Sequence, residues 1–486
     1  MNMDYAESHG TAHDAARGQG NWTFACVTFG CKVNQYETQA IREAWMRAGG
    51  REVEEPAGAD LVLVNSCAIT SRAERDARNA LTRMHRDSSS SLLVLTGCAA
   101  RLVADFVPRR HAPVPRPDSV FVQERKEDLC REDVIVHLVQ LACQKRADTR
   151  STIATPDVED AHWKDLRDRP YPAMQIECYK RVRPVLKVQD GCTHRCTYCI
   201  VPLTRGPHVS RRPEEVVAEA RRLLQDHAEI MLSGVNLGQY GRDNRAFGDF
   251  WELLQRLEDE LAPEFAGRRR IRISSLEPSQ LDERGCTILA GTSLIAPHLH
   301  ISLQHASSSV LKRMGRGHYS AETLTRALER LQKAWPVMGL GADIIVGFPG
   351  ETPEDVDILC RFIEETPFTY AHVFPYSRRP GTAAAGFAGQ VEKKEKALRA
   401  AQVRAVVADR ARAFWQARSQ DMNMALALDA AEGHLVEGCV HAVDAFYTPC
   451  FIPVASLQKL EEGAGRREFV RASAQGVCEK GVLVEL

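Results

Sequence analysis

Short apolar runs alternate with stretches of helical spacing in the first patterned part of the chain. The apolar runs cover residues 24–29, 61–64 and 92–95, and the amphipathic stretches between them cover 35–48 and 72–85. Strands that alternate with helices indicate βαβ units and a parallel sheet. We therefore predict an open parallel α/β domain over residues 21–145.

A second alternating series begins at residue 185. Its strand-like runs are 185–189, 230–233, 271–274, 298–303, 341–346 and 371–375, and its amphipathic stretches are 213–225, 250–261, 321–334 and 353–364. Six βα repeats over about 200 residues predict a partial (β/α)6 barrel, whose chemistry lies in the loops after the strands. This domain is expected at 181–418.

The rest of the chain has weaker patterns. After a charged helical stretch at 392–418, the runs 435–440, 448–454, 467–471 and 482–486 are short and separated by glycine and charged residues, which predicts a small antiparallel β-barrel at 419–486. Residues 1–20 are polar and are expected to be a disordered leader. Residues 146–180 are charged and poorly patterned, as in a linker.

Composition narrows the class of protein. The chain has 486 residues, of which 44% are hydrophobic and 26% charged, as in ordinary soluble globular proteins. Its net charge of -1 provides no general attraction to polyanions, so any nucleic-acid site must be a local patch. The 15 cysteines are an odd number, which excludes an even disulfide framework and favours a cytoplasmic location. No run approaches the 18 apolar residues of a membrane span.

Three cysteines follow the first strand of the second series in C-x3-C-x2-C spacing, namely Cys192, Cys196 and Cys199. Structural zinc takes four protein ligands, and ordinary iron–sulfur clusters are held by four thiolates. One interpretation is a zinc site completed by His194 or a distant residue. The other is a cluster that keeps one iron free for a small molecule.

Three further cysteines, Cys31, Cys67 and Cys98, each come directly after a strand of the first series. The carboxyl ends of parallel strands share one edge of a sheet, where open α/β folds bind ligands. We therefore expect these three side chains to converge as a second metal site. The alternative is that they are ordinary buried cysteines, which are common in protein cores.

Several segments resemble a known enzyme family. Residues 28–37, 64–67 and 96–98 resemble the N-terminal domain of the radical S-adenosylmethionine (SAM) methylthiotransferases, and 189–206, 272–278, 298–304, 314–316 and 374–382 resemble their catalytic core. The stretches Gly-Cys-Lys-Val-Asn-Gln-Tyr-Glu and Ser-Ser-Leu-Glu-Pro are most similar to the branch that modifies N6-threonylcarbamoyladenosine in tRNA. Two other branches modify N6-isopentenyladenosine in tRNA and an aspartate of a small-subunit ribosomal protein.

The resemblance implies two [4Fe–4S] clusters, one on each cysteine trio, and SAM as both methyl donor and radical source. It implies methylthiolation of C2 of the modified adenosine next to the anticodon, with a tRNA substrate, a cellular one-electron donor and a sulfur source as partners. A rival of another class is a zinc protein that binds RNA without catalysis.

Residues after the barrel strands are the candidates for SAM contacts. They are Ser233, Gly234, Asn236, Gln304, Gly347 and Glu351. The segment Gln-His-Ala-Ser-Ser-Ser at 304–309 departs from the Gln-Ser-Gly-Ser-Asp that is usual in the family, near the expected SAM or substrate face.

Candidate RNA contacts are few. The basic groups at 211–212, 268–270 and 378–379 are expected in loops, either as solvated surface or as phosphate contacts. Phe446 and Tyr447 are either base-stacking residues or core aromatics.

Overall fold

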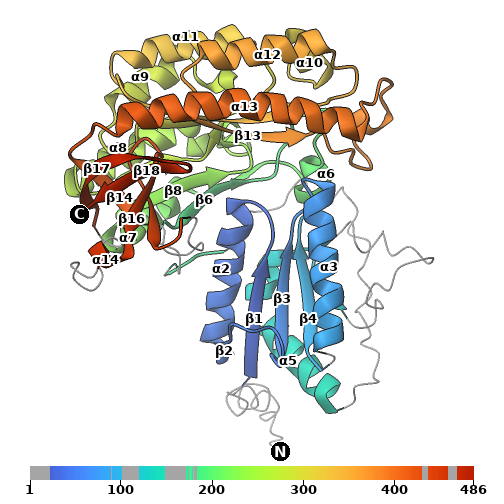
Figure 1. Cartoon of the computed structure of the whole chain (residues 1–486). Coiled ribbons are helices and arrows are strands. Elements are labelled where there is room, and N and C mark those ends of the chain that lie inside the picture. Colours follow the sequence, from blue (N-terminus) through green and yellow to red (C-terminus); the bar gives the residue numbers. More distant parts are fainter. Residues whose placement is uncertain are drawn as a thin grey trace, which may run out of the picture. The chain divides into compact units, whose positions relative to one another are not determined.

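The computed structural model describes residues 22–88, 90–100, 120–147, 171–172, 174–177, 179, 183–428, 436–457 and 468–486. The chain forms two compact units, Met1–Asp165 with Pro172–Ile176, and Leu166–Tyr171 with Glu177–Leu486 (Figure 1). The expected leader and most of the expected linker lie outside the described residues. Within the described ranges, no helix has the length and apolar character needed to cross a bilayer.

The first unit is the predicted parallel α/β domain. Its sheet has the order β2-β1-β3-β4-β5, and every neighbouring pair is parallel. The strands are β1 (Trp22–Thr28), β2 (Gly50–Glu52), β3 (Leu61–Ser66), β4 (Leu92–Gly97) and β5 (Val120–Val122), and the helices are α2 (Lys32–Arg47), α3 (Ser71–Asp87), η2 (Lys126–Cys130) and α5 (Glu132–Ala147).

Alternation along β1 directs its side chains to two different cores. Ala25 packs with Leu81 and Met84 of α3, in a core that also includes Val62 and Leu93. The neighbouring residues Trp22 and Phe24 instead contact Trp45 of α2. The sheet is therefore covered on both faces, as a parallel sheet requires, and only its edges remain for a site.

The second unit begins with the predicted partial barrel. The parallel strands are β6 (Val185–Asp190), β8 (Glu229–Gly234), β9 (Arg270–Ile273), β10 (Ser275–Leu276), β11 (His298–Gln304), β12 (Gly339–Val346) and β13 (Tyr370–Pro375), with β7 (Val209–Ser210) antiparallel at the edge. The sheets are β7-β6-β8-β9 and β10-β11-β12-β13, and Ser274 alone separates β9 from β10. This confirms the six predicted strands.

Helices flank these strands. They are α6 (Val201–Arg205), α7 (Pro213–Asp226), α8 (Phe250–Phe265), α9 (Glu283–Gly291), α10 (Ser308–Arg313), α11 (Ala321–Gln332), α12 (Pro353–Glu365) and α13 (Lys393–Arg418), with the short turns η4 (Leu237–Gln239), η5 (Arg245–Phe247), η6 (Pro278–Gln280) and η7 (Ala383–Gly386). Helices α11, α12 and α13 run along one side of the strands in Figure 1. Local sequence sets where the helices start. Helix α8, for example, begins with a capping box between Asp249 and Glu252.

The C-terminal part is a closed five-stranded barrel of order β14-β15-β16-β18-β17, which confirms the predicted barrel. Its pairs are antiparallel as expected except β16 and β18, which pair in parallel. Its elements are β14 (Met424–Leu428), β15 (Cys439–Val443), β16 (Pro449–Pro453), α14 (Val454–Leu457), β17 (Val470–Cys478) and β18 (Gly481–Glu485). Strand β14 was not predicted, and β15 begins later than the predicted run. The sequence Met-Ala-Leu-Ala-Leu contains no β-branched or aromatic residue, so propensity gives no strand signal there.

Candidate functional site

The trio Cys192, Cys196 and Cys199 lies in the loop after β6 and lines one cavity of about 90 Å³. One water molecule needs a cavity of roughly 10–15 Å³, so a cavity of this volume admits a small group of atoms. Gly191 makes the loop possible, because it has φ 70° and a Cβ there would lie 1.8 Å from the carbonyl oxygen of Pro207. The loop is fixed further by Cys192 N–H, which donates to Gly206 O over 3.0 Å.

The protein alone does not stabilise thiolates at this loop. Burial raises the pKa of the Cys192 thiol and raises that of Cys199 to about 12. A bound metal group supplies the positive charge that keeps coordinating thiols deprotonated. The three sulfurs around one small cavity therefore fit a cationic metal group, and they do not fit reactive free thiolates.

Polar side chains complete the cavity wall beside the cysteines. Asn236 Nδ2 lies 3.8 Å from Cys192 Sγ and donates to Glu277 Oε1 over 3.2 Å. Its own backbone N–H donates to Gln189 Oε1 over 2.8 Å, which fixes the loop after β8 against β6. Arg316 also lines the cavity and lies 3.3 Å from Glu277. Charged groups with matched partners thus face the open side of the cysteine trio.

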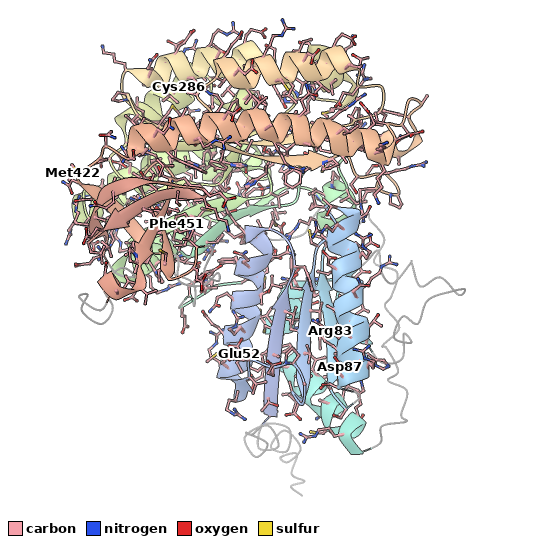
Figure 2. All side chains as sticks on the ribbon, viewed as in Figure 1. Glu52, Arg83, Asp87, Cys286, Met422 and Phe451 are labelled. Carbon is pink, nitrogen blue, oxygen red and sulfur yellow. The ribbon has the colours of Figure 1, made fainter. Side chains whose placement is uncertain are left out.

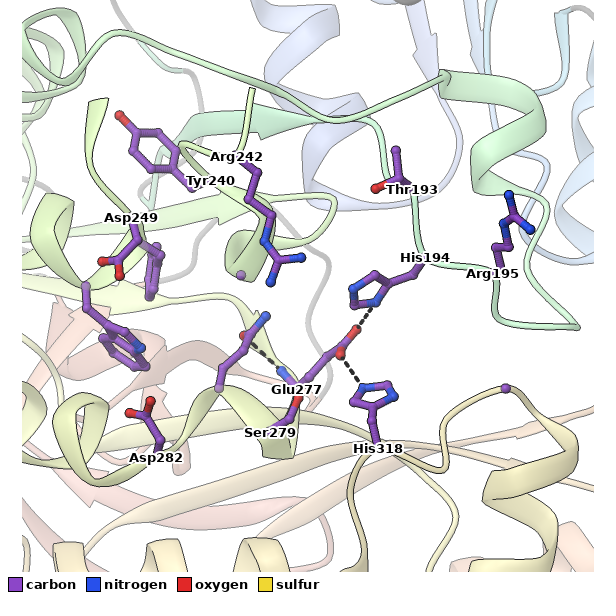
Figure 3. Close-up of a pocket in the computed structure, with 15 residues that line it drawn as sticks. Thr193, His194, Arg195, Tyr240, Arg242, Asp249, Glu277, Ser279, Asp282 and His318 are labelled. Carbon is purple, nitrogen blue, oxygen red and sulfur yellow. Dashed lines mark hydrogen bonds and ion pairs between the residues drawn. The ribbon is translucent and has the colours of Figure 1, made fainter. Parts of the chain in front are cut away.

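Glu277 contacts most of the polar side chains in this part of the cavity wall. Its carboxylate oxygens lie 3.2 Å from His194 Nδ1 and 3.3 Å from His318 Nε2, and dashed lines mark both contacts in Figure 3. Burial alone would raise the pKa of Glu277, but the hydrogen bond from His194 and the charge of Arg316 outweigh it and lower the pKa to about 2. His194 and Glu277 also line a neighbouring pocket of about 720 Å³ with Trp251 (Figure 3). Glu277 is therefore a permanent anion that links the cysteine loop to the loop after α10.

Glu277→Gln is expected to lower the melting temperature of the protein by the same amount at pH 7 and pH 9. A pKa depressed from 4.5 to about 2 corresponds to roughly 3 kcal/mol of stability, present above about pH 4.5 and lost as the pH falls toward 2. Thermal unfolding at the two pH values measures the effect. Glu283→Gln, at an exposed position of α9, serves as the control. A deficit that disappears between pH 7 and pH 9 would contradict the assignment.

The predicted SAM contacts are distributed around the same strand ends, but only Asn236 lines the cysteine cavity. Ser233 is buried at the end of β8, and a Cβ on Gly234 would lie 3.0 Å from Gln189. Gln304 ends β11 with φ 63°, an unusual conformation for a residue other than glycine. The structure thus places these residues near the correct barrel edge without assigning them contacts.

Gly347 and Glu351 form a local structure of their own. Gly347 N–H donates to Glu351 Oε1 over 2.8 Å, and Arg399 Nη1 of α13 donates to the same oxygen over 2.9 Å. The Glu351 carboxylate therefore stabilises the turn after β12 and its contact with α13, a structural role that the sequence did not indicate.

Sequence reasoning missed the roles of Glu277, Arg316 and His318. Glu277 and Arg316 stand in two of the segments that resemble the family, but no role was assigned to them. Their partners lie far away in sequence, since Glu277 contacts His194 across 83 residues. No local spacing could have identified this network.

In the first unit, Cys31, Cys67 and Cys98 follow three neighbouring parallel strands, as predicted. Cys31 is the N-cap of α2, Cys67 directly follows β3, and Cys98 directly follows β4. A Cβ on Gly30 would lie 2.7 Å from Cys67 Cβ, so the loop that carries Cys31 lies against Cys67. Cys31 is exposed, whereas Cys67 and Cys98 are buried.

Asparagine side chains hold these loops together. Asn34 Nδ2 donates to Phe29 O over 2.8 Å and to Ser66 O over 2.9 Å, which ties the loop after β1 to the end of β3. Asn65 Nδ2 donates back to Asn34 O over 3.0 Å. Cys98 N–H donates to Ser66 O over 3.0 Å, which joins the third strand end. The sequence positions converge because of sheet order and these amide bridges.

The spacing of the sulfurs bears on the zinc alternative. Thiolates bound to one zinc at 2.3 Å in a tetrahedron lie roughly 4 Å apart. Among the described residues, only one trio of ligand side chains brings its atoms within 4.8 Å of one another, and it contains no cysteine. In neither cysteine trio do all three sulfurs lie within 4.8 Å of one another, so the described side chains do not outline a single-ion zinc site.

Several candidate RNA contacts are buried. Arg211, Arg270 and Arg379 are each less than a tenth exposed, so the prediction that they lie in solvated loops was wrong. Arg211 pairs with the buried Glu219 at 2.8 Å. The neighbouring residues Arg212, Arg268 and Arg378 are exposed.

The two aromatic candidates are packed in the second unit. Tyr447 packs against His298 and Tyr370 at ring distances of 5.1 and 5.4 Å. Phe446 lies under Arg418, whose guanidinium carbon is 4.6 Å from the ring centroid. These contacts favour the core interpretation of both side chains over base stacking.

Comparison with known proteins agrees with this geometry. The model of the Radical SAM superfamily matches residues 186–363, and that of the uncharacterized protein family UPF0004 matches residues 23–113. The threonylcarbamoyladenosine tRNA methylthiotransferase MtaB of Bacillus subtilis is 35% identical over 77% of this chain and 78% of its own length. MtaB of Thermotoga maritima is 33% identical over 77% and 79%. The tRNA-2-methylthio-N(6)-dimethylallyladenosine synthase of Bartonella bacilliformis is 31% identical over 80% and 82%. By fold, cysteine arrangement and the extent of this identity, the chain belongs to the family of radical-SAM methylthiotransferases.

Proposed function

We propose that this enzyme attaches a methylthio group to C2 of N6-threonylcarbamoyladenosine, next to the anticodon of tRNA, in the cytoplasm. The observation that carries the proposal is the pair of cysteine trios, each at the carboxyl ends of parallel strands in a separate unit. The names of the MtaB relatives support the choice of substrate.

In this proposal the two trios have different tasks. Cys192, Cys196 and Cys199 hold one [4Fe–4S] cluster, and Cys31, Cys67 and Cys98 hold a second. When bound, the first cluster supplies the electron that splits SAM and so generates a radical, and the second presents the sulfur that is inserted. Asn236, which faces both Cys192 and Glu277, orients SAM beside the first trio.

The reaction needs two molecules of SAM and two partners. One SAM would give its methyl group to the sulfur. The other, on accepting one electron, would be cleaved to methionine and a 5′-deoxyadenosyl radical, which would take the hydrogen from C2 and leave as 5′-deoxyadenosine. A carbon–sulfur bond then replaces that carbon–hydrogen bond. A cellular one-electron donor and a sulfur source must supply what SAM does not.

Mass spectrometry of tRNA nucleosides from a strain that lacks the gene tests the substrate. We expect the methylthio group to disappear from threonylcarbamoyladenosine alone and to return when the wild-type chain is expressed. The Bartonella relative is named as the synthase of 2-methylthio-N(6)-dimethylallyladenosine. This product is the methylthiolated form of N6-isopentenyladenosine, the second candidate substrate. Loss from that nucleoside would replace the first proposal, and unchanged tRNA would point to the ribosomal-protein aspartate.

A further inference from the structure

The interior face of the barrel is polar along three neighbouring strands. On β11, His298, His300 and Ser302 alternate with Leu299 and Ile301, which are fully buried. Successive side chains of a strand point to opposite faces, so the two histidines share the face opposite the apolar residues. Barrel interiors are usually filled with branched apolar side chains. A polar interior therefore calls for a chemical explanation.

Strand register brings three of these polar groups together. Asp343 of β12 pairs directly with His372 of β13, and His300 of β11 pairs with Gly341, two residues earlier on β12. The Nε2 atom of His300 lies 3.2 Å from Asp343 Oδ1. One ligand atom from each of His300, Asp343 and His372 lies within 4.8 Å of the other two. We propose that this trio is a binding site for a divalent transition-metal ion, separate from both cysteine sites.

A second layer of contacts orients His300. Gly341 lies between His300 and Tyr370 in the register of the three strands. Because Gly341 has no side chain, the Tyr370 ring crosses β12 there, and a Cβ would lie 2.1 Å from that ring. Tyr370 Oη thereby reaches His300 Nδ1 at 2.9 Å. Ligating histidines commonly engage their other ring nitrogen in this way, which fixes the tautomer.

The Tyr370 hydroxyl also contacts His298. Its Nε2 atom lies 2.9 Å from Tyr370 Oη. Tyr370 can donate to His298 and accept from Nδ1–H of His300. In this order Nε2 of His300 is available to bind an ion that Asp343 Oδ1, 3.2 Å away, would also contact.

The donor set indicates the class of ion. Two imidazoles and one carboxylate suit zinc, iron(II) and manganese(II), and three protein ligands leave coordination positions open. Ligand atoms about 2.1 Å from an ion lie roughly 3–3.4 Å apart, a spacing that His300 and Asp343 already have. His372 is exposed, and its ring lies 5.5 Å from the ring of His300. Its ligand atom lies within 4.8 Å of the other two, so it offers the third ligand.

The site is distinct from the SAM cavity. Its three residues precede the carboxyl ends of their strands by three or four positions, which places them roughly 10–13 Å below that edge at ~3.3 Å per residue. None of them lines the cysteine cavity. Metal binding at this trio would be independent of the identity of the RNA substrate.

Zinc binding by the full-length, cluster-loaded protein tests the proposal. The protein is dialysed anaerobically against Zn²⁺ in competition with a chelator, and zinc and iron are measured per chain. We expect the wild type to hold one zinc more than His372→Ala or Asp343→Asn at the same free Zn²⁺. Because loss of a contact to a ligand costs about 10–100-fold in affinity, loss of a ligand itself should cost at least ~10-fold.

Two readouts separate this result from damage to the fold or to the clusters. Iron content should be the same in wild type and both variants, and His372 is exposed, so its loss removes little packing. His137→Ala, an exposed histidine of α5 in the first unit, should bind zinc as the wild type does. Equal zinc affinity in wild type, His372→Ala and Asp343→Asn would overturn the proposal.

Discussion

Cys196→Ala is expected to abolish cleavage of SAM, whereas Cys67→Ala should leave that cleavage measurable and end methylthiolation. As a radical-SAM enzyme, the protein uses SAM and a [4Fe–4S] cluster. Cys196 lines the small cavity that it shares with Cys192, Cys199 and Asn236. Its removal leaves two thiols whose pKa values burial already raises, which is too few for a cluster.

Cys67 lies in the other compact unit, at the end of β3, and takes no part in that cavity. Its loss should therefore remove the sulfur-presenting function and spare radical formation. Formation of 5′-deoxyadenosine and of methylthiolated RNA under a strong reductant measures the two steps separately. Iron per chain should fall from about eight to about four in each variant.

A third cysteine provides the matched control. Cys286, labelled in Figure 2, is buried on α9, where its thiol lies 3.7 Å from Leu281 O. Cys286→Ala should retain both activities and the full iron content. Complete loss of SAM cleavage in Cys67→Ala would contradict the division of tasks, and zinc in place of iron in the wild type would contradict the catalytic proposal altogether.

The sequence predicted the fold where periodicity and strand ends were strong, and it failed where composition was neutral. Strand β14 escaped because alanine and leucine do not distinguish strand from helix. Helix α9 escaped because it is short and contains Gly285 and Gly291, which are poor helix formers. Strand order explains why Cys31, Cys67 and Cys98, far apart in sequence, follow neighbouring strands, whereas Cys192, Cys196 and Cys199 share one loop. Cluster binding by the six cysteines stays a prediction.

Tertiary partners were not predictable in the same way. The strand predicted at 271–274 forms at Arg270–Ile273, but Arg270 was expected in a loop, either as solvated surface or as a phosphate contact. Charged residues are normally at the surface, and only the position of Glu229, about 40 residues earlier, reverses that expectation. The contacts of Glu277 and of the trio His300, Asp343 and His372 were not predicted for the same reason, because their partners lie on other elements.

The pairing of Glu229 with Arg270 and Arg272 leads to the second large expected effect. Glu229→Gln should lower the free energy of unfolding of the second unit by about 3–5 kcal/mol, the usual cost of removing one partner from a buried ion pair. Glu229 is almost fully buried at the start of β8. Arg272 Nε and Nη2 donate to its two carboxylate oxygens over 2.9 and 2.8 Å, and Arg270 Nε donates as well.

The same arginines connect the partial barrel to the C-terminal barrel. Arg270 Nη2 donates to Val443 O over 3.1 Å, and Arg272 Nη2 donates to Asp444 O over 2.9 Å. Burial alone would raise the pKa of Glu229, but the two guanidinium groups outweigh it and hold the pKa far below its ordinary value. Glutamine keeps the shape of the side chain but leaves two buried cations without a counter-charge. The docking of both barrels should weaken together.

Thermal unfolding of the cluster-loaded protein measures the effect. At roughly 2–4 °C per kcal/mol for domains of 150–250 residues, the melting temperature should fall by on the order of 10 °C. Glu264→Gln is the matched control, because Glu264 pairs with Arg221 at 2.7 Å while both side chains are more than a third exposed. Exposed pairs contribute about 0–1 kcal/mol, so that variant should melt close to the wild type. Equal melting temperatures for the two variants would show that Glu229 does not hold the barrels together.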